Sequence, residues 1–177
     1  MSYINVQNSA LRAALVSNFL TAELLASRAG DDYELWLISP WVTNFALSVP
    51  SGGDLSVLVD TAEPRPHLLE VLRQIAANSG RVGVVVRPEY QAARVERFIR
   101  PLQALAAEPN ITVRHCPDLH AKIYVGQYGA LYGSLNLTES GIERNIEFGA
   151  YASDARTIAR LRAEAQSLFE DAEELAR

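Results

Sequence analysis

Residues 120–136 read H-A-K-I-Y-V-G-Q-Y-G-A-L-Y-G-S-L-N, so that polar and apolar side chains alternate around a glycine-rich turn. Side chains two residues apart on a strand face the same way. His120 and Lys122 are therefore expected to project together, with the apolar residues between them on the opposite face. The pattern predicts one strand at Ala121–Val125 and a second at Ala130–Leu135, joined by a tight turn.

The same polar spacing of two recurs further along the chain. It is found in Ser134 with Asn136 and in Asn145 with Glu147. A third strand is predicted at Asn145–Ala152, where Ile146 and Phe148 should lie on the face opposite to Asn145 and Glu147. If the three strands are neighbours in one sheet, their polar pairs converge on one patch.

Such a patch suits the chemistry of a phosphoryl group. Lys122 supplies a point charge with three donors, and Asn136 and Ser134 add neutral donors for the oxygens of an oxyanion. His120 could act as nucleophile or as general acid and base near neutral pH. Glu147 could accept from the imidazole and fix its tautomer. This residue set requires neither a metal nor a cofactor.

Alternating helices and strands precede and follow this region. Helices are predicted at Ser9–Ala29, Pro66–Asn78, Glu89–Ala107 (kinked by Pro101) and Asp154–Ala176, and strands at Glu34–Val42, Leu55–Val59, Arg81–Arg87 and Ile111–His115. Ser9 and Ser153 are the predicted helix caps. The order predicts an α/β fold in which a mixed sheet is sandwiched between helices, as a single domain over residues 1–177.

Composition narrows the function classes. The chain has 177 residues, 49% of them hydrophobic, and a net charge of −5, which argues against non-specific coating of nucleic acid or membrane. Its positive charge comes from arginine except at Lys122, the lone lysine. One cysteine, Cys116, and an N-terminal stretch without an apolar run favour a cytoplasmic protein with no membrane association.

The pattern from His120 to Glu147 resembles the signature of the phospholipase D superfamily, H-x-K-x-x-x-x-D with G-S-x-N downstream. Here it reads His120-Ala121-Lys122 and then Gly133-Ser134-Leu135-Asn136. One copy is present, as in the small bacterial phospholipase D-like nucleases, which form their site across a homodimer. The resemblance implies a phospholipase D-like mixed sheet between helices.

The resemblance also implies a two-step phosphodiester transfer. His120 of one subunit would form a phosphohistidine, and His120 of the partner subunit would protonate the leaving oxygen. Lys122 and Asn136 would hold the non-bridging oxygens, Ser134 would assist them, and Glu147 would orient the histidine. The expected protein is a metal-independent nuclease, a homodimer that acts on DNA.

One position departs from the signature: Gln127 stands where the family has aspartate. This keeps two alternatives open. The chain could be a degenerate, non-catalytic module that binds nucleic acid or scaffolds a complex, for example in a DNA modification or defence system. It could instead be a phospholipase or phosphatidyl transferase. DNA is favoured over lipid because no apolar interfacial helix with a basic face is evident.

The remaining polar and aromatic residues have plainer interpretations. His67, at a helix start, is expected to be solvated, and His115 is expected to be structural. Trp41 could stack on a base at a strand end. Arg87 is one of three arginines that could guide a polyanion, although isolated surface arginines are common.

Overall fold

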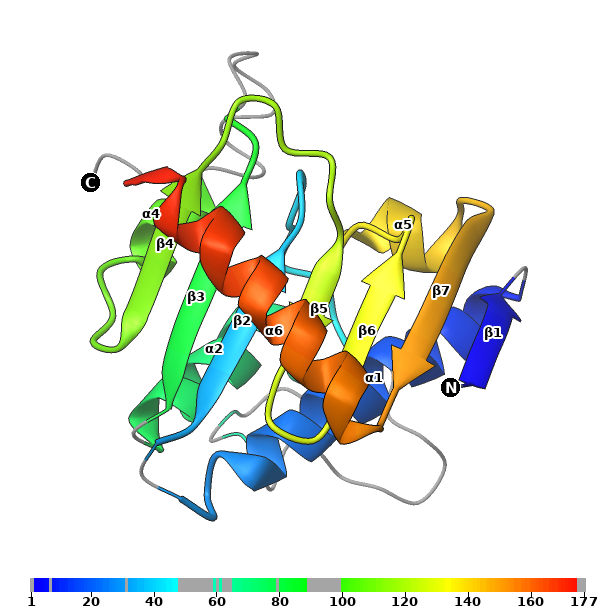
Figure 1. The fold of residues 1–177 in the computed structure, drawn as a ribbon, viewed down its shortest axis with the longest axis horizontal. Coiled ribbons are helices and arrows are strands. Elements are labelled where there is room, and N and C mark those ends of the chain that lie inside the picture. Colours follow the sequence, from blue (N-terminus) through cyan, green and yellow to red (C-terminus); the bar gives the residue numbers. More distant parts are fainter. Residues whose placement is uncertain are drawn as a thin grey trace.

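The computed structural model describes residues 2–6, 8–30, 32–47, 59, 61, 65–78, 80–88 and 100–174. Eight strands form one mixed sheet in the order β1-β7-β6-β5-β2-β3-β4-β8 (Figure 1). The strands are β1 (Ser2–Val6), β2 (Glu34–Ile38), β3 (Arg81–Val86), β4 (Ile111–His115), β5 (Ile123–Val125), β6 (Ala130–Gly133), β7 (Glu147–Ala152) and β8 (Glu173–Glu174). The helices are α1 (Ser9–Ala26), α2 (Leu68–Ala77), α4 (Arg100–Leu105), α5 (Glu139–Glu143) and α6 (Ala155–Glu170).

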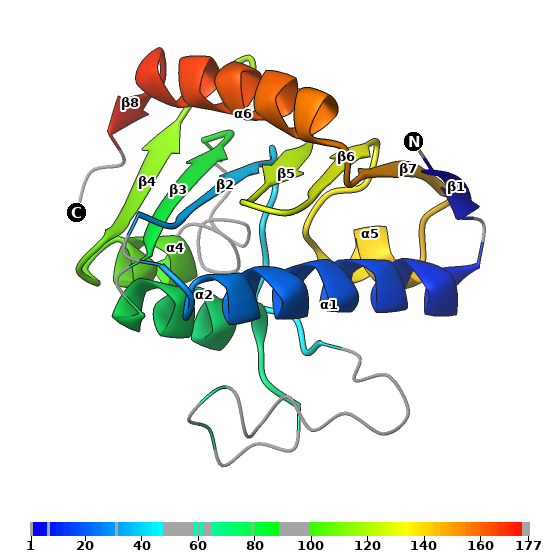
Figure 2. The same cartoon turned by 60° about the horizontal axis from the view of Figure 1, so that its bottom comes forward.

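Helices cover both faces of this sheet. Figure 2 shows α6 over one face, and α1, α2, α4 and α5 over the other. Alternate residues of β2 accordingly enter different apolar layers: Leu35 and Leu37 pack toward α1 and α2, whereas Ile38 belongs to the layer under α6. The predicted α/β class, a mixed sheet between helices, is confirmed.

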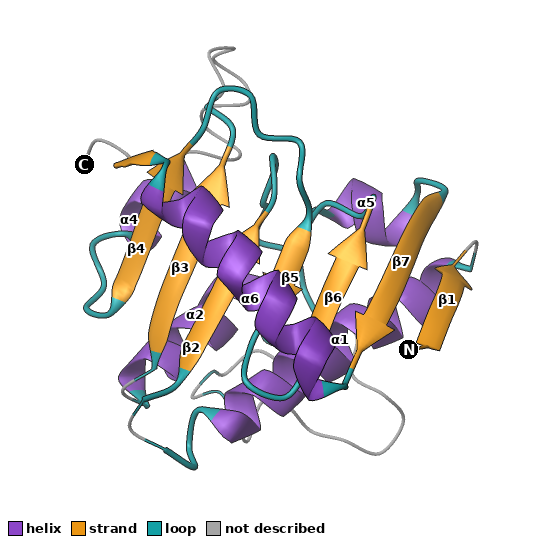
Figure 3. Ribbon diagram, in the orientation of Figure 1, coloured by secondary structure: helices purple, strands orange, loops and turns teal. Residues whose placement is uncertain are grey.

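Strand direction decides which residues share an edge. β2 pairs in parallel with β3, and β3 pairs in parallel with β4. The other pairings are antiparallel: β5 pairs with β2, β6 with β5 and β7 with β6. The ends of β2, β3, β4 and β6 therefore meet the starts of β5 and β7 along one edge (Figure 3). Every polar pair singled out in the sequence lies at this edge.

Several predicted boundaries are wrong. Asn8 caps α1 in place of Ser9, accepting from Ala10 N at 2.9 Å, and Asp154 caps α6 in place of Ser153, accepting from Thr157 N at 2.9 Å. In each case the amide or carboxylate oxygen of the residue next to the predicted cap reaches a free N–H of the first turn, and this suffices as a cap.

The final helix is also shorter than predicted. It ends at Glu170, and the chain turns so that β8 pairs with β4 through Arg114 and Glu174. Strand β1 was not predicted, and it forms by pairing antiparallel with β7. Both pairings join segments far apart in the chain, which local periodicity does not report.

Two predicted elements fall partly outside the described residues. These are the strand at Leu55–Val59, of which Val59 alone is described, and residues 89–99 of the helix predicted at Glu89–Ala107. Pro101 is the second residue of α4, so the predicted kink falls where the helix joins residues outside the described part. A first-turn proline is tolerated because its missing N–H would have no helical partner there.

No helix in the described ranges is both long and apolar enough to cross a bilayer.

Candidate functional site

The polar pairs lie at strand ends rather than within strands. β5 begins at Ile123, so that His120 and Lys122 precede it, and β6 ends at Gly133, so that Ser134 and Asn136 follow it. The strands are shorter than predicted, but a hydrogen bond of 3.3 Å from Gly133 N to Lys122 O continues the pairing beyond them. The two halves of the motif are therefore neighbours across the β5–β6 hairpin.

A hydrogen-bonded group joins β6 to β7. The Ser134 hydroxyl donates to one oxygen of the Glu147 carboxylate, and Asn145 Nδ2 donates to the other at 3.0 Å. The Phe148 amide donates to Ser134 Oγ at 2.9 Å. Glu147 is only 8% exposed, and the two hydrogen bonds fix the orientation of its buried carboxylate from both sides.

Lys122 lies beside this carboxylate. It is 8% exposed, and its Nζ donates to the His120 main-chain carbonyl at 2.6 Å. Burial lowers the pKa of Lys122, the negative charge of Glu147 opposes that shift, and the positive charge of Arg87 adds to it. An ammonium with one main-chain acceptor still has donors for the oxygens of an anion.

His120 is exposed at the same edge. Among the residues that the structure describes, no group hydrogen-bonds its imidazole, and the Glu147 oxygens accept from Ser134 and Asn145 instead. The ring is thus open on its outer side to a ligand or to another chain.

Two residues that the sequence analysis did not select hold the Asn136 segment. The buried Tyr124 hydroxyl donates to Leu135 O at 2.5 Å and approaches Ser39 Oγ at 3.3 Å. Ser39 Oγ donates to Trp41 O at 2.9 Å and lies 3.4 Å from Asn136 Oδ1. Burial raises the pKa of Tyr124, so that its proton stays available for the Leu135 carbonyl. A tyrosine and a serine at otherwise apolar strand positions were the available signal.

Replacing Tyr124 by phenylalanine should lower the free energy of unfolding by about 1–3 kcal/mol, because the Leu135 carbonyl would lose its partner in a buried setting. Urea unfolding followed by circular dichroism measures the change. Tyr128→Phe is the matched control, since Tyr128 is 59% exposed. Equal stability of the two variants would contradict this role of Tyr124.

The position that departs from the signature lies at the opposite end of β5. Gln127 is exposed in the β5–β6 turn, and its main-chain N–H donates to Glu23 Oε2 at 2.9 Å. Glu23 comes from α1, is 1% exposed and also accepts from the Tyr33 hydroxyl at 2.8 Å. Burial raises the pKa of Glu23, while the hydrogen bonds from Tyr33 and from the main chain of residues 127–129 oppose the shift. A carboxylate therefore holds this turn, although residue 127 does not supply it.

Replacing Glu23 by alanine should cost about 2–4 kcal/mol, because the Gln127 amide and the Tyr33 hydroxyl would both lose a buried acceptor. Thermal and urea unfolding test the loss. Glu164→Ala, at an exposed position of α6, should leave stability within about 0.5 kcal/mol. A Glu23 variant as stable as this control would show that the turn does not need the carboxylate.

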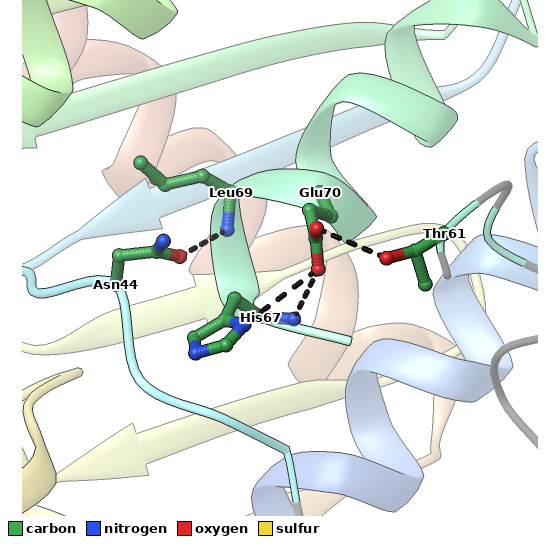
Figure 4. Close-up of polar contacts among 5 residues, drawn as sticks. All are labelled: Asn44, Thr61, His67, Leu69 and Glu70. Atoms are coloured by element: carbon green, nitrogen blue, oxygen red, sulfur yellow. Dashed lines mark hydrogen bonds and ion pairs between the residues drawn. The ribbon is translucent and has the colours of Figure 1, made fainter. Parts of the chain in front are cut away.

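The other two histidines each lie beside a carboxylate. His67 begins α2, where its main-chain N–H donates to Glu70 Oε2 at 2.7 Å and its ring lies 3.7 Å from the same oxygen (Figure 4). Asn44 Oδ1 accepts from Leu69 N at 3.0 Å in the same cluster, so that the start of α2 is fully capped. His67 is half-buried in this contact rather than freely solvated.

His115, on β4, lies 3.8 Å from Glu173 of β8, which agrees with a structural role. Cys116 is half-buried. In the described ranges no three His, Cys, Asp or Glu side chains gather as metal ligands.

Ile146 and Phe148, the apolar residues that alternate with Asn145 and Glu147, do not enter the core. Ile146 is 84% exposed and Phe148 46%. Figure 1 shows why residues at the start of β7 stay exposed: α6 crosses the sheet diagonally and reaches β7 only near the end of that strand. Among the described helices, none covers the start of β7 on that face, and Ile146 and Phe148 form an exposed apolar surface there.

Comparison with known proteins identifies a family model and solved structures that match this chain. The family model described as cardiolipin synthase, PLD-like domain, matches residues 54–169, which is more than half of the chain. Among solved structures, NucT from Helicobacter pylori aligns with a TM-score of 0.62 at 12% identity, covering 98% of each chain.

Two further structures share the fold. Nuc from Salmonella typhimurium, a phospholipase D family member, gives a TM-score of 0.60 at 13% identity over 89% of this chain and 90% of its own. The archaeal chromatin protein TrmBL2 gives 0.53 at 12% identity over 90% of this chain and 50% of its own. A search of curated protein sequences found no match.

Proposed function

The chain belongs to the phospholipase D superfamily, and on that premise we propose that it is a metal-independent phosphodiesterase, a nuclease acting on DNA. The observation that carries the proposal is the gathering of Lys122, Ser134 and Glu147 at one sheet edge beside the exposed ring of His120. A nucleophile, a cation and a fixed carboxylate are the groups that phosphoryl transfer through a histidine requires.

The proposed reaction has two displacements at phosphorus. A ring nitrogen of His120 attacks, the bond from phosphorus to the leaving oxygen breaks, and His120 of the partner subunit gives that oxygen a proton. The partner's His120 then takes a proton from water, whose oxygen attacks phosphorus and breaks the bond to nitrogen. Lys122 and Asn136 hold the non-bridging oxygens in both steps, with Ser134 assisting.

Glu147 serves as a positioning residue in this scheme. Ser134 and Asn145 hold its carboxylate in place, and its negative charge would stabilise the imidazolium that forms during transfer. The exposed His120 ring can turn toward it when substrate and partner are in place.

The second imidazole must come from another copy of the chain, so the active protein is proposed to be a homodimer. Of the other histidines, His67 lies beside Glu70 at the start of α2, and His115, at the end of β4, lies beside Glu173. The exposed apolar pair Ile146 and Phe148 adjoins the catalytic edge and supports a contact between copies there.

The Gln127 position supports activity rather than loss of it. Its side chain is exposed in the turn at the end of β5 remote from His120, and Glu23 supplies a carboxylate to that turn. The proposed chemistry requires nothing of residue 127. DNA as substrate is supported by the likeness to TrmBL2, an archaeal chromatin protein with a novel mode of DNA binding.

Cleavage of plasmid DNA in the presence of EDTA tests the activity. Nicking or linearisation that continues with all divalent metal removed supports the nuclease. Binding without cleavage by pure protein would identify a non-catalytic module, and turnover of a phosphatidyl substrate without DNA cleavage would identify a lipid enzyme. Light scattering tests the homodimer separately.

A further inference from the structure

We propose that Arg87, stacked on Trp41, binds a second phosphate of the substrate, next to the one that is cleaved, and so selects a polymer of phosphodiesters. This inference rests on the proposed function and specifies its substrate class. A nucleic acid offers phosphates on both sides of the cleaved bond, whereas a phospholipid with one phosphodiester does not.

Main-chain hydrogen bonds fix Arg87 at the catalytic edge. It directly follows β3, and its N–H donates to Pro40 O at 3.0 Å, while Ser39 N donates to Val85 O at 3.0 Å. The ends of β2 and β3 are thus joined one residue beyond each strand, at the edge where β5 begins (Figure 1).

The side chain of Arg87 is oriented by stacking. Its guanidinium carbon lies 4.8 Å from the centroid of the Trp41 ring, a cation–π distance. Stacking covers one face of the planar group and leaves the N–H donors along its rim unused. Arginine held in this way loses little freedom when it binds an anion.

Arg87 also differs from the other arginines that are not exposed. Arg12, Arg114 and Arg162 each donate to a main-chain carbonyl, those of Ile142, Phe169 and Gly126 respectively. Within the described part of the chain, the half-buried Arg87 side chain has no such acceptor and no ion pair. A half-buried guanidinium with unused donors is ready for an anion from outside the protein.

The position of Arg87 favours a neighbouring phosphate over the one that reacts. Its charge reaches Lys122, since it contributes to the lowered pKa of that ammonium. However, β2 lies between β3 and β5, so that the two residues arise from strands roughly 10 Å apart. Lys122 Nζ donates to the His120 carbonyl, and Glu147, whose charge acts on Lys122, begins β7 on the other side of β5 from Arg87.

The test compares a polymer with a single phosphodiester. Arg87→Ala, Arg87→Lys and the wild type are assayed on a single-stranded oligonucleotide and on bis(para-nitrophenyl) phosphate. Arg160→Ala, exposed on α6, removes the same charge elsewhere and is the matched control. Oligonucleotide affinity is measured in parallel by fluorescence anisotropy over a series of salt concentrations, in the presence of EDTA and in a His120→Ala background.

We expect Arg87→Ala to raise KM for the oligonucleotide about ten-fold and to leave the small substrate unchanged, with the slope of log K against log salt smaller by about 0.7. Arg87→Lys should keep the salt slope and lose part of the affinity, because lysine keeps the charge but not the planar stack. Because lysine keeps the positive charge and the aliphatic part of the side chain, Arg87→Lys still tests the proposal if the alanine variant fails to fold. Arg160→Ala should change neither quantity.

Three results would overturn the proposal. Equal losses on both substrates would assign Arg87 to the reacting phosphate, and equal losses in Arg87→Ala and Arg160→Ala would reduce its effect to general charge. Turnover of the small substrate and of a phosphatidyl substrate, but not of the oligonucleotide, would show that the enzyme does not select a polymer of phosphodiesters. A wild type inactive on every substrate would refute the nuclease itself, and the anisotropy series would still decide whether Arg87 binds a phosphate.

Discussion

Replacing His120 by alanine should lower cleavage of plasmid DNA in EDTA by about three orders of magnitude or more, because its imidazole is the proposed nucleophile at phosphorus. The ring is exposed and, within the described residues, unpartnered, so its removal should leave the fold intact. The assay follows nicking of supercoiled plasmid over time, with circular dichroism as a check on folding.

Two comparisons sharpen this prediction. His115→Ala removes a histidine that contacts Glu173 and should keep most of the activity, since His115 takes no part in the proposed chemistry. Acid-labile label retained from a radiolabelled phosphodiester by the wild type, and absent in His120→Ala, would report the phosphohistidine. Undiminished cleavage by the His120 variant would refute the mechanism.

Replacing Ile146 by aspartate should convert the protein to a monomer and abolish most of its activity together. A charge placed in an apolar contact between copies costs about 3 kcal/mol, or roughly a hundred-fold in Kd. Ile146 is 84% exposed in the single chain, so the substitution should not disturb the fold. Light scattering and the plasmid assay, performed at several protein concentrations, measure both effects.

Leu25→Asp is the matched control, because Leu25 is 49% exposed on α1. It should leave both the assembly state and the cleavage rate unchanged. Activity lost through weak dimerisation should return as the concentration of the Ile146 variant rises. A monomeric Ile146→Asp protein with full activity would contradict a site that needs two copies of His120.

Much of the site could be predicted because its residues are close in sequence. His120, Lys122, Ser134 and Asn136 lie on one hairpin, and the strand period of two placed each pair on one face before any tertiary contact was known. The mixed sheet between helices followed from the order of elements. The strands themselves were predicted too long, because alternation of polarity continues beyond the last ladder pairing.

Other features depended on contacts that local sequence does not encode. Ile146 and Phe148 alternate correctly with Asn145 and Glu147, yet they are exposed because α6 does not extend over the start of β7. The pairing of β1 with β7 escaped prediction for a related reason, since a short edge strand is specified by its neighbour.

Long-range contacts also decided how the β5–β6 turn is held and where Arg87 lies. Glu23, more than one hundred residues before Gln127, supplies the carboxylate of the β5–β6 turn, as its hydrogen bond of 2.9 Å shows. Arg87 and Trp41 meet because β2 and β3 are parallel and end at the same edge. Neither pairing has a period or a motif by which the sequence could reveal it.

By itself, the sequence determined the family and the class of fold, because both follow from residue type and from the spacing and order of elements along the chain, and it nominated His120 and its neighbours as the proposed reactive groups. The tertiary structure alone decided which carboxylate holds the turn, which apolar residues stay outside the core and which arginine stacks on Trp41. The physical reason is that burial and partnership are properties of packed surfaces, and a packed surface joins residues whose separation in the chain is arbitrary.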